Sequence, residues 1–326
     1  MKVLVTGGAG YIGSHIVHDL CDQAHEVIIL DNFSLGRREN VDPRAQLIEG
    51  DVRNMEDLNK AFGMRVEVVF HFAAWKAAGE SMTNPMKFAN NNICGTLSLL
   101  NAVVEHNVNY FIFSSSAAVY GSPQYLPIDE KHPKNPENYY GYTKLAIEEN
   151  LEWYSKLKNI RYAALRYFNA TGYDVKGRIL GMENNPTNLC PVVMETACGM
   201  REKLLIFGND YNTPDGTCIR DYIHVSDLSE AHLLAMDYII EENKNLIVNL
   251  GTGSGNSVLE MVEAAQEAVE KKINHQIIGR RPGDPENLIA SSELAFNLIN
   301  WKAKHSDLKT IFKSMIPVYF KNMNKR

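Results

Sequence analysis

The segment Lys2-Val3-Leu4-Val5-Thr6-Gly7-Gly8-Ala9-Gly10-Tyr11-Ile12-Gly13 decides the fold. Its first half is a short apolar run, which predicts a buried β-strand. Gly7, Gly10 and Gly13 allow the chain to turn tightly after that strand and to approach a ligand closely. A helical pattern begins near Ser14, so backbone amides at the positive end of this helix would face the turn. Strand, glycine turn and helix together predict a site for the pyrophosphate of a dinucleotide.

An acidic residue, Asp31, ends the second apolar run, roughly twenty residues after the glycines. A carboxylate at this point can bind the ribose hydroxyls of the dinucleotide and repels the 2′-phosphate of NADP. Arg37 and Arg38 follow soon after and could attract that phosphate. The position of Asp31 nevertheless favours NAD as the cofactor.

Short apolar runs rich in Val, Ile and Phe recur along the first half of the chain, at residues 3–6, 27–30, 66–72, 110–114 and 162–167. Their hydrophobicity is continuous rather than alternating, which indicates strands buried on both faces of a parallel sheet. The intervening segments are long enough for helices, and residues 90–105 and 140–156 are expected to form the longest. We therefore predict an α/β fold with a Rossmann-type, doubly wound parallel sheet.

The pattern becomes irregular after about residue 170, where Gly, Asn, Pro and Asp cluster. We expect residues 1–170 to form the NAD-binding domain, with a strand returning to the sheet near residues 247–251. Residues 171–326 are expected to form mainly a smaller C-terminal lobe that binds the substrate.

The composition of the chain excludes several classes of binding partner. The 326-residue chain has a net charge of −6, which gives no electrostatic attraction for nucleic acid or an anionic membrane. No apolar stretch approaches the roughly 20 residues of a membrane helix, and no secretion signal is recognisable. The five cysteines are scattered without a C-x-x-C pair, so neither a disulfide framework nor a metal site is expected. These features predict a cytoplasmic protein.

A second group of residues indicates catalysis. Tyr140 and Lys144 lie four residues apart, hence on one face of a helix. A phenol of pKa near 10 is a poor base, but a neighbouring ammonium and a positive nicotinamide both favour its phenolate form. The Y-x-x-x-K pattern alone is common on exposed helices. Here it follows Ser116 at the end of a predicted strand, and this context favours a catalytic Ser-Tyr-Lys set.

From the glycine turn through Lys144 the chain resembles the extended short-chain dehydrogenases/reductases. The second half is similar to the UDP-glucose 4-epimerases on several motifs: Arg166-Tyr167-Phe168-Asn169, Pro186-Thr187-Asn188-Leu189, residues 207–211, residues 215–225, Arg280-Arg281-Pro282-Gly283-Asp284 and Trp301. The resemblance implies an isomerase with tightly bound NAD that interconverts UDP-galactose and UDP-glucose. It also implies transient oxidation at C4, a 4-keto intermediate that rotates, and Tyr140 as the proton acceptor.

The resemblance also implies the residues of both sites, carried over by matching motif. The residues expected around NAD are Gly7, Gly10, Tyr11, Ile12, Gly13, Asp31, Asn32, Asp51, Val52, Phe72, Lys76, Asn91, Tyr140, Lys144 and Phe168. The residues expected around the UDP-hexose are Ser116, Asn169, Asn188, Leu189, Phe207, Arg220, Arg281, Asp284 and Leu288. Arginine supplies permanently charged, planar forks suited to a diphosphate. Surface solubility or helix capping explains any one of these residues, but not the set.

Particular residues bear on other possible functions. Nucleotide-sugar dehydratases and decarboxylases typically carry an acid before Val-Tyr-Gly, where this chain has Ala117-Ala118. A non-catalytic NAD sensor need not keep Ser116, Tyr140 and Lys144. Leu288 stands where strict UDP-glucose enzymes have a bulky Tyr, which leaves open a UDP-N-acetylglucosamine 4-epimerase or a bifunctional enzyme. The family likeness further implies a homodimer formed through the two long helices.

Overall fold

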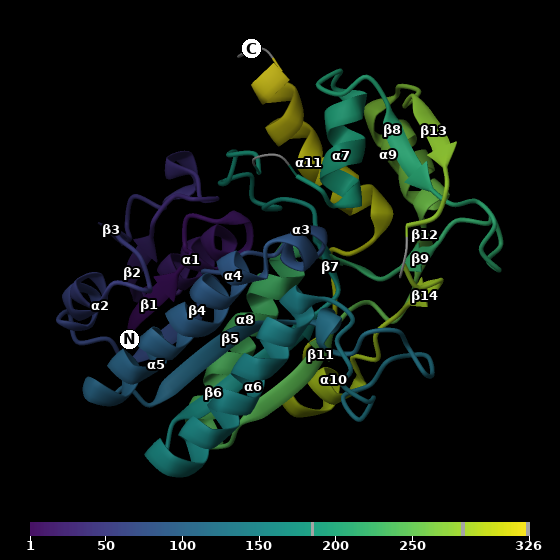
Figure 1. The fold of residues 1–326 in the computed structure, drawn as a ribbon. Coiled ribbons are helices and arrows are strands. Elements are labelled where there is room, and N and C mark those ends of the chain that lie inside the picture. The colour runs from purple at the N-terminus through teal and green to yellow at the C-terminus, as the bar shows by residue number, and fades with distance from the viewer. Residues whose placement is uncertain (184–185, 282–283, 324–326) are drawn as a thin grey trace.

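A parallel sheet of seven strands lies at the centre of the computed structural model, which describes residues 1–183, 186–281 and 284–323 (Figure 1). Its strand order is β11-β6-β5-β4-β1-β2-β3. The strands are β1 (Lys2–Thr6), β2 (Glu26–Asp31), β3 (Gln46–Glu49), β4 (Val68–His71), β5 (Tyr110–Ser116), β6 (Arg161–Tyr167) and β11 (Leu246–Leu250). The order runs outward from β1 in both directions, so the predicted Rossmann-type, doubly wound sheet is confirmed.

Helices cover both faces of this sheet. Val3 and Val5 point into one apolar core and Leu4 into another, because successive side chains of a strand face opposite sides. The first core is covered by α1 (Tyr11–Asp22), α8 (Val225–Glu241) and α10 (Glu293–Ile299). The second is covered by α2 (Met55–Phe62), α5 (Gly95–Glu105) and α6 (Tyr139–Lys158). Burial on both faces explains the continuous apolar runs of the sequence.

The later part of the chain contributes more to the sheet than one returning strand. β11 pairs with β6, as expected for residues 247–251. In addition, α8 and α10 pack their apolar sides onto the sheet, although both follow residue 170. The two helices are amphipathic, a pattern that does not specify which apolar surface they cover.

The remaining elements form a smaller lobe beside the carboxyl edge of the sheet, at the upper right of Figure 1. Its own apolar core joins α7 (Leu189–Ala197), α9 (Val258–Val269) and α11 (Leu308–Met323) to the parallel pair β8 (Leu204–Phe207) and β13 (His275–Ile278). Short strands connect the lobe to the sheet: β7 (Asn169–Thr171), β9 (Ile219–Arg220), β10 (Tyr222–His224), β12 (Asn256–Ser257) and β14 (Asn287–Leu288). No helix in the described ranges is long and apolar enough to cross a membrane.

The helix expected over residues 90–105 does not begin as an α-helix. Residues Ala89–Cys94 form a π-helix that continues into α5. Within it the buried Asn92 side chain accepts a hydrogen bond from the backbone N–H of Trp75 and donates one to its carbonyl, both at 2.9 Å. The widened turn therefore lets a side chain reach the loop after β4, a feature typical of π-bulges at functional sites.

The glycine turn is held by backbone contacts. Gly7 has a φ of +73°, and a Cβ at Gly13 would overlap the carbonyl oxygen of Gly7. At this point α1 therefore touches the end of β1 through main-chain atoms alone, which only glycine permits.

We expect Gly13→Ala to lower the free energy of unfolding by about 1–3 kcal/mol, because the added methyl group must displace backbone rather than a flexible side chain. Urea unfolding followed by circular dichroism would measure it. Gly79→Ala is the matched control, since Gly79 lies in α3 (Ala78–Thr83) with no atom within 4 Å of the added methyl. The control should instead stabilise by about 0.5–1 kcal/mol. Equal effects of the two changes would contradict the steric argument.

Candidate active site

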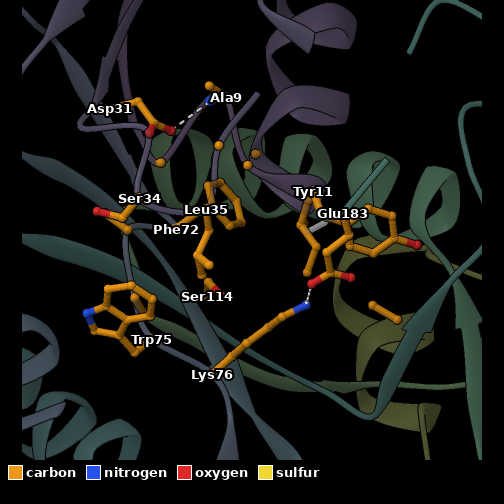
Figure 2. A pocket seen from close by; sticks show the side chains of 18 of the residues that line it. Ala9, Tyr11, Asp31, Ser34, Leu35, Phe72, Trp75, Lys76, Ser114 and Glu183 are labelled. Carbon is orange, nitrogen blue, oxygen red and sulfur yellow. Dashed lines mark hydrogen bonds and ion pairs between the residues drawn. The ribbon is translucent and has the colours of Figure 1, made fainter. Parts of the chain in front are cut away.

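A pocket of about 380 Å³ opens at the carboxyl edge of the central sheet (Figure 2). Parallel strands bring their carboxyl ends to one edge, where doubly wound sheets bind ligands. Every residue expected to contact NAD lines this pocket: Gly7, Gly10, Tyr11, Ile12, Gly13, Asp31, Asn32, Asp51, Val52, Phe72, Lys76, Asn91, Tyr140, Lys144 and Phe168. The structure therefore brings together side chains from across the first half of the chain.

The glycine end of the pocket suits an anion. Helix α1 begins after Gly10, and among the described residues no side chain caps it and no acid lies in its first turn. Amides of an uncapped first turn and the helix dipole attract a phosphate. Tyr11 turns its hydroxyl away from the turn to donate to the carbonyl of Gly172 at 2.6 Å. The glycine cradle and the free amides fit the pyrophosphate of NAD.

The acid that ends β2 is held in place by the backbone. Asp31 accepts a hydrogen bond from the N–H group of Ala9 at 2.9 Å (Figure 2) and another from that of Phe33 at 2.8 Å. Burial raises the pKa of Asp31, and these two bonds oppose the rise by stabilising the carboxylate. The carboxylate is thus directed at the pocket, where a ribose would meet it.

The two arginines after Asp31 are already engaged. Arg37 donates through Nε to the carbonyl of Met182 at 2.8 Å. Arg38 pairs with Glu49 at 2.5 Å, away from the pocket lining. Arg38 thus lies away from the pocket, and the Asp31 carboxylate that lines it suits NAD rather than NADP.

Ser116 and Tyr140 meet where β5 ends and α6 begins. Asn138 caps α6 by accepting from the N–H of Gly141 at 2.9 Å, and Ser81 Oγ accepts from the N–H of Tyr140 at 3.0 Å. Burial raises the pKa of Tyr140, and its hydrogen bond with Ser116 opposes the rise. The protein alone therefore keeps the phenol protonated. Its use as a base depends on positive charge brought beside it.

Lys144 lies one turn further along α6. Its Nζ donates to the carbonyl of Ser114 at 2.6 Å and lies 5.8 Å from the centre of the Tyr140 ring. Burial lowers the pKa of Lys144 to about 7, while the charge of Glu148 raises it. The lysine can thus change its charge near neutral pH, in the same pocket as the phenol that it would assist.

The residues expected at the UDP-hexose fall into two groups. Ser116, Asn169 and Asn188 line the pocket, and Leu189 follows Asn188 at the start of α7. The others lie outside the pocket lining, on the lobe: Phe207, Arg220, Arg281, Asp284 and Leu288.

Charged and aromatic contacts hold the lobe group together. Arg220 pairs with Asp284 at 2.5 Å, and the Arg281 guanidinium lies 3.8 Å from the centre of the Phe207 ring. Leu288 on β14 pairs in register with Arg220 on β9. It also packs against the buried cluster Ala117, Val119, Tyr120 and Ile128, which follows Ser116. Arg220 on β9 and Arg281, in the segment between β13 and β14, are thus each held by a neighbour within the lobe.

The structure adds pocket residues that sequence reasoning did not identify. Glu183 pairs with Lys76 across the pocket (Figure 2), and Trp75 lines it beside Lys76. Glu183 lies in an irregular segment without a recognisable motif, so nothing in the sequence links it to Lys76. Ser114 ends the apolar run predicted over residues 110–114, and its backbone carbonyl accepts a hydrogen bond from Lys144. Within the described ranges no group of His, Cys, Asp or Glu could hold a metal ion.

Comparison with known proteins agrees with this geometry. Residues 3–251 match the model of the NAD dependent epimerase/dehydratase family. A UDP-glucose 4-epimerase of Streptococcus mutans is 43% identical over 318 residues, which cover 96% of this chain and 95% of the relative. The structure of a UDP-glucose 4-epimerase from Brucella ovis in complex with NAD superposes with a TM-score of 0.95 at 42% identity, covering 98% of each chain.

A similar structure was solved with more than the dinucleotide. The UDP-glucose 4-epimerase from Bifidobacterium longum in complex with NAD+ and UDP is 36% identical, with a TM-score of 0.92 and coverage of 100% of this chain and 99% of that one. The likeness to enzymes of this name thus extends over both the sheet and the lobe. The chain belongs to the NAD dependent epimerase/dehydratase family.

Proposed function

We propose that the chain is a UDP-glucose 4-epimerase that interconverts UDP-galactose and UDP-glucose with tightly bound NAD. The single observation that carries the proposal is the meeting of Ser116, Tyr140 and Lys144 in the pocket that begins at the glycine turn. Reversible oxidation of a sugar alcohol requires a group that exchanges the proton, here Tyr140, and a residue that assists it, here Lys144. It also requires a dinucleotide site beside them, which the glycine turn provides.

NAD, when bound, supplies reversible oxidation of the sugar at C4. The chain's own groups would hold it: the amides of the glycine turn would bind the pyrophosphate, Asp31 the adenosine ribose, and Lys144 the nicotinamide ribose. Tyr140 accepts the proton from O4 and later returns it. Ser116 hydrogen-bonds the same oxygen. The positive charges of Lys144 and the nicotinamide offset the effect of burial on the pKa of Tyr140.

The lobe holds the nucleotide while the sugar turns. Arg220 and Arg281 bind the diphosphate, and Asn169 and Asn188 offer amides from the pocket wall. A 4-keto sugar tethered only through UDP can present its opposite face, so the returned hydrogen inverts C4. Residues 1–170 thus serve mainly NAD and residues 171–326 mainly the UDP-sugar.

The reaction ends without elimination. Ala117 and Ala118 follow Ser116 and carry no acid to expel water or carbon dioxide.

The five cysteines are free thiols, one of them exposed, which supports action in the reducing cytoplasm.

The purified protein should convert UDP-galactose to UDP-glucose without added NAD, because the cofactor is restored in every cycle and stays bound. Chromatographic analysis of the sugar nucleotides after incubation measures this. UDP-N-acetylgalactosamine, incubated separately, reports whether the space beside Leu288 admits an N-acetyl group. Conversion of neither compound, even with NAD added, would refute the epimerase.

Tyr140→Phe should lower turnover by at least about a hundredfold, because the phenol is the group that accepts and returns the O4 proton. The amount of bound NAD should stay close to that of the unmodified protein, since the ring is kept. Tyr142→Phe is the matched control, because Tyr142 lies on the same helix with 49% of its surface exposed. Near-normal turnover of Tyr140→Phe would exclude the proton-transfer role.

We propose further that two copies form a homodimer through α5 and α6. Helix α6 exposes three large apolar or aromatic side chains to solvent: Tyr142, Trp153 (61% exposed) and Leu157 (69% exposed). An isologous contact would cover the same helices of both copies at once. Residues of one chain line the pocket, so each copy of the dimer would keep a complete pocket.

The double change Trp153→Glu with Leu157→Glu should yield monomers at concentrations where the unmodified protein is dimeric, because it buries carboxylates in the contact. Analytical ultracentrifugation would measure the mass. Phe296→Glu is the control, since Phe296 is 53% exposed on α10, which covers the opposite face of the sheet. A dimer that survives the double change would exclude this interface.

A further inference from the structure

Helix α6 carries a buried carboxylate in addition to Tyr140 and Lys144. Glu148 lies one turn beyond Lys144 and is 4% exposed. Its carboxylate accepts two hydrogen bonds from Arg166, at 2.9 Å from Nε and 2.5 Å from a terminal nitrogen. Replacement of a buried ion pair by apolar residues is often neutral or stabilising, so stability alone does not account for this pair.

Lys144 and Glu148 are fixed to successive residues of β5. The Lys144 ammonium donates to the carbonyl of Ser114, and the Ser115 hydroxyl donates to Glu148 at 2.5 Å. Ser115 is in register with Arg166 on the neighbouring strand β6. Three elements therefore determine where the carboxylate lies relative to the lysine.

Arg166 is itself held on its far side. It donates to the Tyr120 hydroxyl at 2.8 Å, and that hydroxyl donates to Asn249 on β11 at 2.7 Å. The guanidinium is buried, with 2% of its surface exposed. Its place is thus fixed independently of Lys144, and it gives the Glu148 carboxylate a buried, permanently charged partner.

The other groups around Lys144 and Glu148 supply no second negative charge near neutral pH. They are His71 on β4, Tyr140 on α6, Tyr162 and Tyr167 on β6, Arg166 on β6 and Tyr120 after β5. Burial holds the pKa of His71 at about 3, so His71 is neutral, and burial raises the pKa of each tyrosine. Among the described residues, Glu148 is the one whose charge favours the ammonium of Lys144.

We propose that Glu148 is a positioning residue that keeps Lys144 in its charged form, ready to assist Tyr140 and to bind the cofactor ribose. Its effect on catalysis rests on the proposed epimerase function, whereas its effect on Lys144 does not. The two are therefore tested by separate measurements.

The first experiment titrates Lys144 directly in the purified full-length protein. Lysine labelled at Cε with an NMR-active carbon reports the charge of each ammonium, and Lys144→Arg assigns the signal. Glu148→Gln removes the carboxylate charge and should lower the pKa of Lys144 by about 1 or more. Glu149→Gln, the neighbouring exposed residue, should leave that pKa unchanged. An unchanged pKa of Lys144 in folded Glu148→Gln would overturn the proposal.

The second experiment follows epimerisation against pH in the same variants. Charged Lys144 is lost as pH rises through its pKa, so a lower pKa moves the high-pH decline of kcat downward by about one pH unit. A purely structural role would lower kcat alike at every pH and would contradict the proposal. If the unmodified protein shows no epimerase activity while Glu148→Gln lowers the pKa of Lys144, the positioning role stands and the proposed function falls.

Loss of the carboxylate leaves Arg166 buried without its counter-charge, which could prevent Glu148→Gln from folding. The double change Glu148→Leu with Arg166→Met removes both charges and keeps apolar side chains of similar volume. It should fold and again lower the pKa of Lys144, because the favourable charge is gone. An unchanged pKa in this variant would equally refute the proposal.

Discussion

All strands of the central sheet run in one direction, and the rest of the structure depends on this constraint. It brings Thr6, Asp31, His71, Ser116 and Tyr167, the last residues of five strands, to one edge. The chain that leaves each strand there must cross the edge before it enters a helix. Residues distant in sequence thus line one pocket, while apolar packing on both faces keeps the strands from shifting.

Packing alone does not align α6 with the strand end that it serves. Apolar contacts are non-directional, so they do not by themselves select one angular position of a polar side chain over another. Polar contacts remove this freedom: Lys144 bonds to the backbone of β5, and Glu148 bonds to Ser115 and to Arg166. Tyr140, Lys144 and Glu148 are spaced by four residues and therefore lie on one face of the helix. The bonds of Lys144 and Glu148 thus also fix the direction in which the Tyr140 side chain points.

Most of the sheet could be predicted because its central strands are continuous apolar runs, whereas the edge strand β3, with one buried residue, has no such run. The glycine turn and Asp31 could be predicted because their spacing has a physical cause. The packing of α8 and α10 on the sheet could not, since amphipathicity states that a helix has an apolar side but not what that side covers.

The site was predictable only in part, for a related reason. Contacts such as Lys76 with Glu183 or Asn92 with Trp75 join residues through tertiary structure, and no local pattern encodes them. The π-helix depends on such a contact. The residues expected at the UDP-hexose came from family resemblance rather than from physics. Arg166, which was recognised only as part of a motif, proves to be the buried partner of Glu148.

Local charge, not net charge, makes the chain able to bind anions. With a net charge of −6 the whole molecule repels a nucleotide sugar, so attraction must come from groups that are close and desolvated. At the glycine turn, the attraction comes from uncapped backbone N–H groups, which attract an anion without any charged side chain. On the lobe, Arg220 and Arg281 are the residues proposed to bind the diphosphate, and contacts with Asp284 and the Phe207 ring hold their guanidiniums in place. Side chains held in advance lose less conformational entropy on binding, so this arrangement would strengthen the proposed binding of the diphosphate.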